Sequence, residues 1–214
     1  MKKYQYILLD WDGNLAQTLD VWLEAFRIPL EKRGLSITDE DIASSFGMFP
    51  QFVVAWGLKD VDAIVEEADK LAKIKMPEVD LYPDALEVLN GLRDMGKHLA
   101  LVTTTLHENV RHLLEKFQIL DYFEVIVAGD DVTNHKPHPE SLERALSLLV
   151  GRANEAIMIG DSDKDLRAAT NAGIDSVLFF PPEHRKFYNF GKLKEHKPTY
   201  VIEDFRKLLD IVGE

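Results

Sequence analysis

Two carboxylates with one residue between them are the first residues of this sequence that could do chemistry: Asp10 and Asp12, followed by Gly13. The apolar run before them, Tyr6 to Leu9, predicts a short buried strand that delivers Asp10 to the edge of a sheet. Because strand side chains alternate between faces, we expect both carboxylates to converge on one point. Such a pair is costly unless a metal ion, a shared proton or a cation offsets the repulsion. An ordinary turn, in which Asp and Gly are common, explains the same residues without chemistry.

Three later stretches place polar residues where chemistry could continue. They are Leu99-Ala100-Leu101-Val102-Thr103-Thr104, Lys136-Pro137-His138-Pro139 and Ile157-Met158-Ile159-Gly160-Asp161-Ser162-Asp163-Lys164-Asp165. A hydroxyl at a strand end, followed by a helix N-terminus, favours an anion because free backbone N–H groups and the helix dipole face it. Taken alone, the threonines fit strand propensity and helix capping equally well, and Lys136 fits a solvated loop.

In this order, the four stretches resemble the motifs of the haloacid dehalogenase-like (HAD) phosphohydrolase superfamily: D-x-D-G-[TV], a strand ending in Thr or Ser, a Lys, and G-D-x-x-x-D. The resemblance spans nearly the whole chain and is closest to the branch of phosphoglycolate phosphatases and β-phosphoglucomutases with a helical cap. One position departs from the pattern, because Asn14 stands where the family usually has Thr or Val.

The resemblance implies a role for each matching residue. Asp10 would be the nucleophile that forms an aspartyl phosphate, and Asp12 the general acid and base. Phosphate would be bound by Thr103, the backbone of Thr104 and Lys136. Mg²⁺ would be held by Asp10, the backbone carbonyl of Asp12 and Asp161, with Asp165 completing or orienting the metal shell. Asp163 and Lys164 lie outside the pattern, and we expect both to be solvated.

The elements that must position these residues follow from periodicity. After residue 81, short apolar runs alternate with helical patterns, which is typical of a parallel sheet covered by helices. We therefore predict an α/β fold, a Rossmann-like doubly wound, mainly parallel sheet, for residues 1–15 and 81–214. Residues 16–80 contain only helical patterns, including a short acidic helix capped by Thr38.

The position of these helices, directly after the first strand, resembles the cap domain that many family members insert there. A cap closes over the core and excludes water from the transferring phosphoryl group. We favour a cap over residues 16–80 because a crossover between parallel strands normally needs one helix. The alternative is that these helices pack as part of a single domain.

Composition restricts the class of protein and its partners. The chain has 214 residues, 46% of them hydrophobic and 29% charged, as in a globular protein. The absence of cysteine excludes thiolate chemistry and disulfides. The seven histidines show no metal-ligand spacing such as H-x-H or H-x-x-x-H, so we expect none of them to bind a metal. The net charge of −12 argues against nucleic acid and anionic membranes as partners. We expect a cytoplasmic protein, a monomer or weak homodimer, that binds a small phosphorylated metabolite.

The leading hypothesis is a Mg²⁺-dependent phosphatase for a small phosphomonoester. A phosphosugar mutase would use the same residues, but the cap stretch Phe46-Gly47-Met48-Phe49 has no basic residue to bind a second phosphate. A non-catalytic protein that binds phosphorylated metabolites is the third alternative.

Two further expectations concern basic residues. We expect His107 to be a helix-surface residue. We expect the lysine-rich segment 183–200 to be a solvated loop rather than a segment that attracts substrate.

Overall fold

A six-stranded, entirely parallel sheet forms the centre of the computed structural model, which describes residues 4–213. The strand order is β3-β2-β1-β4-β5-β6. The strands are β1 (Tyr6–Leu9), β2 (His98–Val102), β3 (Val125–Val127), β4 (Ala156–Gly160), β5 (Asp175–Phe179) and β6 (Tyr200–Ile202). β1 pairs with β2 on one side and β4 on the other, so that the order reverses at β1 and β4. Ligands of doubly wound sheets bind at such a reversal, outside the carboxyl ends of the strands.

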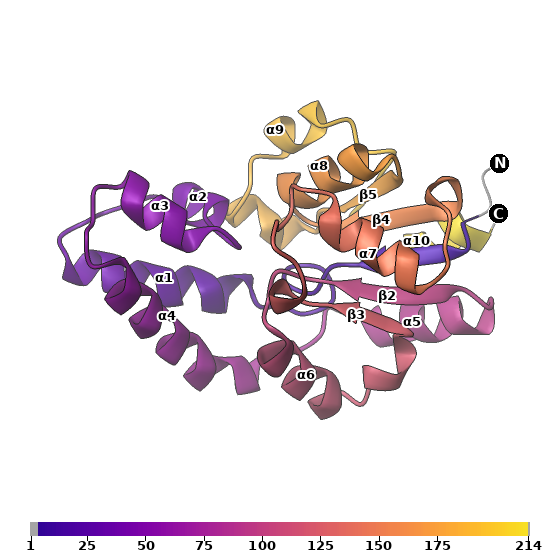
Figure 1. The fold of residues 1–214 in the computed structure, drawn as a ribbon, viewed down its shortest axis with the longest axis horizontal. Helices are drawn as coiled ribbons and strands as arrows, with labels where there is room; N and C mark the ends of the chain where they lie inside the picture. Colours follow the sequence, from indigo (N-terminus) through magenta and orange to yellow (C-terminus); the bar gives the residue numbers. More distant parts are fainter. Residues whose placement is uncertain (1–3, 214) are drawn as a thin grey trace.

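Helices cover both faces of the sheet (Figure 1). On one face, Ile7 and Leu9 of β1 belong to a cluster with apolar residues of α5 (Ala85–Asp94), α6 (His107–Lys116) and α10 (Lys207–Gly213). On the other face, Leu8 belongs to a cluster with residues of α7 (Glu140–Leu148) and α8 (Asp163–Ala172). The alternation of β1 side chains between these clusters explains why its four residues are apolar without a break. The predicted doubly wound α/β fold is confirmed.

Four further helices form a separate group beyond the carboxyl ends of the strands, on the left in Figure 1. They are α1 (Leu19–Lys32), α2 (Asp39–Ser44), α3 (Phe49–Ala55) and α4 (Val61–Lys75). Their apolar faces bury a hydrophobic cluster of their own, in which the rings of Phe26 and Phe49 stack with centroids 3.8 Å apart. Thr38 caps α2, as expected, by accepting a hydrogen bond from Asp41 N at 3.2 Å. The boundary of this helical group as a domain at residues 16 and 80 stays a prediction.

The two segments that connect the helical group to the sheet run side by side. Gln17 N donates to Asp80 O at 2.9 Å, and Tyr82 N donates to Leu15 O at 2.9 Å. Lys116 of α6 fastens the second segment by donating to Val79 O at 2.7 Å. The chain therefore enters and leaves the helical group through two adjacent segments.

The expectation of a solvated loop over residues 183–200 is wrong. A 3₁₀ helix (Pro182–Lys186) and α9 (Phe190–Glu195) occupy most of it, and His184, Phe187 and Leu193 are buried. Two of its lysines form ion pairs with acidic residues of the helical group, Lys186 with Asp20 and Lys192 with Glu40. Phe187 packs in the cluster of the helical group, and Leu193 packs against residues of the sheet and α8. The segment therefore packs against both the helical group and the core, and two of its lysines add ion pairs to the helical group.

No helix in residues 4–213 is long and apolar enough to cross a membrane.

Candidate active site

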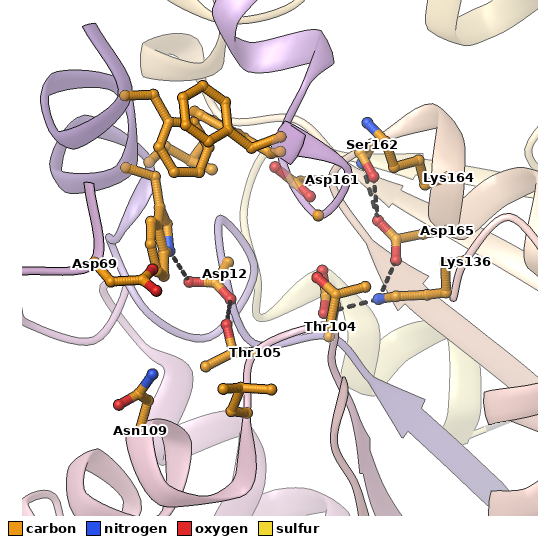
Figure 2. Close-up of a pocket in the computed structure, with 18 of the residues that line it drawn as sticks. Asp12, Asp69, Thr104, Thr105, Asn109, Lys136, Asp161, Ser162, Lys164 and Asp165 are labelled. Atoms are coloured by element: carbon orange, nitrogen blue, oxygen red, sulfur yellow. Dashed lines mark hydrogen bonds and ion pairs between the residues drawn. The ribbon is translucent and has the colours of Figure 1, made fainter. Parts of the chain in front are cut away.

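A lysine and two carboxylates from three separate elements meet at the carboxyl edge of the sheet. Asp10 directly follows β1, Lys136 lies in the loop between β3 and α7, and Asp165 lies in the first turn of α8. Lys136 Nζ lies 2.6 Å from Asp165 Oδ1 (Figure 2). It also lies 2.8 Å from Asp10 Oδ1 and donates to Val102 O at 3.1 Å. All three side chains are buried, so these contacts fix the ammonium directly beside the Asp10 carboxylate.

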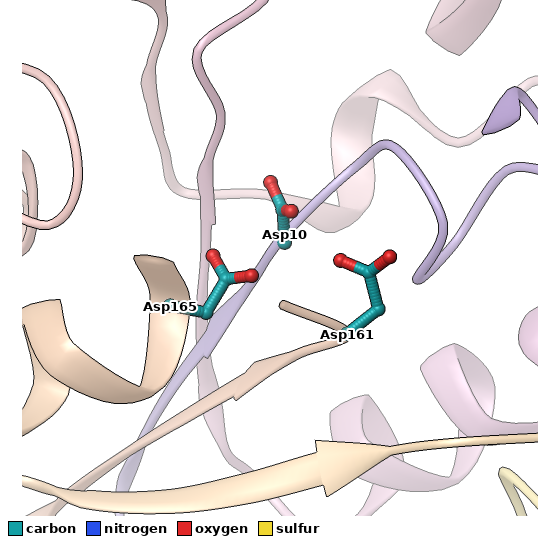
Figure 3. A group of neighbouring side chains, drawn as sticks. All are labelled: Asp10, Asp161 and Asp165. Atoms are coloured by element: carbon teal, nitrogen blue, oxygen red, sulfur yellow. The ribbon is translucent and has the colours of Figure 1, made fainter. Parts of the chain in front are cut away.

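Asp161, which follows β4, completes a group of three buried carboxylates with Asp10 and Asp165 (Figure 3). One oxygen from each lies within 4.8 Å of the others. Burial raises the pKa of Asp10 to about 7, although the charge of Lys136 opposes this. Burial and the charges of Asp165 and Asp10 also raise the pKa of Asp161. The charge of Asp10 and Asp165 raises the pKa of Lys136 in spite of its burial. More negative charge gathers here than this single lysine offsets.

These residues fit a divalent cation with oxygen ligands. Asp161 Oδ2 is buried and has no hydrogen-bond partner within the part of the chain that the structure describes, which is costly unless a cation binds there. Asp165 is already engaged, because its Oδ1 contacts Lys136 and its Oδ2 accepts from Ser162 Oγ at 2.6 Å. The available ligand oxygens therefore belong mainly to Asp10 and Asp161, and Asp165 holds Lys136 in place. An all-oxygen site of this kind suits Mg²⁺.

Gly13 leaves the space in which Asp161 lies. A Cβ at this position would approach Asp161 Oδ2 to 2.2 Å, and φ is +71°. We expect Gly13→Ala to destabilise the fold by about 1–3 kcal/mol and to remove the rise in melting temperature that Mg²⁺ produces. Gly34→Ala is the matched control, because Gly34 has φ +77° but no atom within 4 Å of its Cβ position. If the two variants respond to Mg²⁺ alike in thermal melts, Asp161 is not the ligand that Gly13 accommodates.

The raised pKa of Asp10 predicts a pH dependence of metal binding. An aspartate has a pKa of about 4 in an unfolded chain, whereas that of Asp10 is about 7. The folded chain therefore binds a proton that the unfolded chain releases, and stability without metal falls as the pH rises through this range. Mg²⁺ competes with the same proton, so we expect it to raise the melting temperature more at about pH 8 than at about pH 6. An equal Mg²⁺ effect at both pH values would contradict metal binding by Asp10.

Asp12 is not one of the three clustered carboxylates, but it lines the same cavity as Asp10, and, besides burial, its charge contributes to the raised pKa of Asp10. The predicted convergence of Asp10 and Asp12 on one site is therefore supported, although Asp12 stands apart from the cluster. The strand ends at Leu9, but Asp10 N still donates to Ile159 O at 3.0 Å, and Trp11 packs in the same cluster as Ile7 and Leu9. The backbone N–H groups of Asn14, Leu15 and Ala16 then all donate to Trp11 O in a tight turn. Asn14, the residue that departs from the family pattern, is part of the same turn. It is buried, and its Nδ2 donates to Asp10 O at 3.0 Å.

Three side-chain donors fix the carboxylate of Asp12. Thr18 Oγ1 and Trp22 Nε1 donate to Oδ1 at 2.6 and 2.7 Å. Thr105 Oγ1 donates to Oδ2 at 2.6 Å (Figure 2). Sequence reasoning did not identify these three residues. A third threonine after Thr103 and Thr104 was the only signal for Thr105. Trp22 was interpreted as an apolar position of a helix, and no signal pointed to Thr18, which directly precedes α1.

A cavity of about 340 Å³ lies between the carboxylates and the helical group. Asp10, Asp12, Thr104, Lys136, Asp161 and Asp165 all line it, together with apolar residues of the helical group that include Trp22, Phe26, Phe46 and Phe49. Thr103 is not among its lining residues; its Oγ1 accepts from Thr105 N at 3.0 Å and so shapes the loop below. The cavity has room for a small organic phosphate.

The expectation that Lys164 is solvated is wrong. Its side chain is only 12% exposed, it lines the cavity, and Nζ donates to Ser44 O at the end of α2 at 2.9 Å. The neighbouring Asp163 is more exposed, at 37%. Only the folded chain brings α2 over this loop, so the sequence carried no signal for it. His107, in contrast, begins α6 and contacts Asp131 on the protein surface, as expected.

The family model described as haloacid dehalogenase-like hydrolase matches residues 7–179, and the chain belongs to this family. It is 36% identical over 214 residues to a phosphoglycolate phosphatase of Salmonella typhi, covering 96% of this chain and 77% of that one. It is 33% identical over 216 residues to pyrophosphatase PpaX of Bacillus mycoides, covering 99% of this chain and 98% of that one.

The fold is likewise shared with solved structures of the family. A haloacid dehalogenase-like family hydrolase from Streptococcus pneumoniae has a TM-score of 0.82 and 21% identity, with 99% of each chain covered. With the named relatives, the family places this chain among hydrolases of phosphoric esters.

Proposed function

We propose that this protein is a Mg²⁺-dependent phosphatase that hydrolyses a small phosphomonoester through an aspartyl phosphate on Asp10. The observation that carries the proposal is the separation of two carboxylates along one short turn. Asp10 lies in the group of three carboxylates beside Lys136, whereas Asp12, which lines the same cavity, stands apart from that group and is held by Thr18, Trp22 and Thr105. One carboxylate is thereby available to attack phosphorus and the other to transfer protons.

In the first step, an oxygen of Asp10 forms a bond to phosphorus while the bond from phosphorus to the leaving oxygen breaks. Asp12 gives its proton to that oxygen. In the second step, Asp12 takes a proton from water, whose oxygen bonds to phosphorus and releases Asp10. The donors around Asp12 keep its carboxylate in place for both proton transfers, since both of its oxygens are held.

The charge of the phosphate is met by groups already in place. Lys136 beside Asp10 and the backbone of Thr104 bind its oxygens, with Thr103 shaping the loop. Asp10, Asp161 and the backbone carbonyl of Asp12 would hold Mg²⁺, which when bound neutralises negative charge on the nucleophile and the phosphate together. Asp165 positions Lys136 through the 2.6 Å contact.

Inorganic pyrophosphate is a second candidate substrate. Relatives named pyrophosphatase cover nearly the whole chain, and a further cation, Lys164, lines the cavity. The aromatic wall contributed by Trp22, Phe26, Phe46 and Phe49 favours an organic leaving group instead.

Mutase activity is less favoured, because the stretch Phe46 to Phe49 has no basic residue, although Lys73 of α4 also lines the cavity. The reactive groups are intact, which argues against a protein that only binds.

Purified protein should hydrolyse at least one compound in a panel of phosphoglycolate, sugar phosphates and pyrophosphate in the presence of Mg²⁺. The activity should disappear on chelation and return when Mg²⁺ is added back, because the carboxylate group cannot bind phosphate without a cation. Release of inorganic phosphate measures the reaction, and conversion between isomeric sugar phosphates measures mutase activity. Undiminished turnover after exhaustive metal removal would contradict the proposed site.

A further inference from the structure

A buried lysine that lies outside the family's motif residues is the most informative group the proposed reaction does not use. Lys164 stands on the first turn of α8, between Asp161 and Asp165, and points into the cavity region in Figure 2. Its side chain is 12% exposed, and its hydrogen bond to Ser44 O, a neutral acceptor, is 2.9 Å long. The nearest carboxylate oxygen, Asp163 Oδ1, lies 4.0 Å away, too far for a hydrogen bond.

An ammonium in this state has capacity to bind an anion. It carries several N–H donors, of which the Ser44 carbonyl takes one. A largely buried charge is costly unless it is closely paired and hydrogen-bonded. Because the contact with Asp163 at 4.0 Å is too long for a hydrogen bond, an anionic ligand in the adjacent cavity would give Lys164 a closer partner.

The contact with Ser44 also places part of the helical group over the site. Ser44 ends α2, and its carbonyl is one of the acceptors that a helix C-terminus leaves free. Three residues further on, a Cβ at Gly47 would come within 3.0 Å of Thr104 Oγ1, so this loop lies directly on the predicted phosphate-binding loop. Lys164 therefore joins the carboxylate-bearing loop of the core to the segment that covers it.

We propose that Lys164 is a substrate-binding residue that donates a hydrogen bond to an anionic oxygen of the bound phosphate ester while it holds the end of α2 over the site. The ligand class is a phosphate ester or diphosphate with a free anionic oxygen on the side facing α8. This inference rests on the proposed function, because it takes the cavity to receive a phosphoryl group.

Binding of inorganic phosphate tests this role without requiring turnover. Isothermal titration in the presence of Mg²⁺ compares the full-length wild type with Lys164→Met and Lys164→Gln. We expect both variants to bind phosphate about 10- to 100-fold more weakly, the loss typical of a hydrogen bond to a charged group. The glutamine variant keeps a donor for Ser44 O but has no charge, so its weak binding would assign the effect to the ammonium.

Lys192→Met is the matched control. Lys192 also comes from the core and contacts α2, through its ion pair with Glu40 at 2.7 Å, but it is exposed and away from the cavity. We expect this variant to bind phosphate as the wild type does. Thermal melts verify that each variant is folded.

The outcomes separate this inference from the proposed function. If the wild type does not bind phosphate, the proposed phosphate site itself is wrong. If the wild type binds phosphate and the folded Lys164 variants bind it within about twofold, only the role of Lys164 is overturned. Equal weakening by Lys164→Met and Lys192→Met would overturn it as well, since general attachment of α2 would then explain the effect.

Discussion

Asp10→Asn should reduce phosphate release by at least about a thousand-fold, because an amide cannot replace the carboxylate that attacks phosphorus. The carboxylate lies at the end of β1 with its Oδ1 only 2.8 Å from Lys136 Nζ. The variant should remain folded, since Asn has nearly the same shape and removes one charge from a crowded group. Steady-state kinetics and thermal melts measure both effects.

Asp163→Asn is the matched control for this loss. Asp163 begins α8 close to the same site, but it is 37% exposed and its carboxylate contacts Arg167 on the surface. We expect nearly unchanged turnover from this variant. A comparable loss in both variants would show that the activity depends on the general negative charge of the region rather than on a nucleophile at Asp10.

Asp12→Ala should produce the second large effect, one that depends on the leaving group. The variant lacks the acid that a poor leaving group requires and the base that activates water, but Asp10 can still attack an activated ester. Hydrolysis of an alkyl phosphate should fall by about 10²- to 10⁴-fold, whereas the attack on a nitrophenyl phosphate should fall far less. The ratio of the two rates, measured by stopped-flow and steady-state assays, is the readout.

Asp12→Asn tests whether Asp12 acts by transferring protons or only by filling its position. An amide of the same size keeps an acceptor for Trp22 Nε1 or Thr18 Oγ1, which lie 2.7 and 2.6 Å from the carboxylate. We expect the same dependence on the leaving group as for Asp12→Ala. An asparagine variant that hydrolyses both esters in the wild-type ratio would contradict the role of Asp12 as general acid and base.

The strands and most helices could be predicted because local signals determine them. An unbroken apolar run such as Leu99 to Val102 is stable only when both faces of a strand are covered, and that alone indicates a parallel sheet between helices. In the helical group, the spacing of Phe26, Ile64 and Ala68 predicted helices with a buried face, and the cluster they form follows from it. Asp10 and Asp161 could be found because each directly follows an apolar strand, whereas Lys136 was identified through the resemblance to the family's motifs.

Side-chain directions beyond the strand ends could not be predicted. The hydrogen bonds that hold Asp12 come from Thr18, Trp22 and Thr105, and Thr105 is 93 residues away in the chain. The burial of Lys164 depends on the position of Ser44, which is 120 residues away in the chain. The basic segment was misinterpreted for the same reason, since its partners Asp20 and Glu40 are distant in sequence. Composition describes how polar a segment is, but not what folds against it.

The covalent intermediate on Asp10 is most directly tested by intact-mass spectrometry of Asp12→Ala after rapid quenching with nitrophenyl phosphate and Mg²⁺. Without Asp12 to activate water, the aspartyl phosphate should accumulate, so the spectrum should show the added mass of one phosphoryl group. The double variant Asp10→Asn/Asp12→Ala should show none. Release of nitrophenol by Asp12→Ala with no phosphorylated protein, or an equal adduct on the double variant, would contradict attack by Asp10.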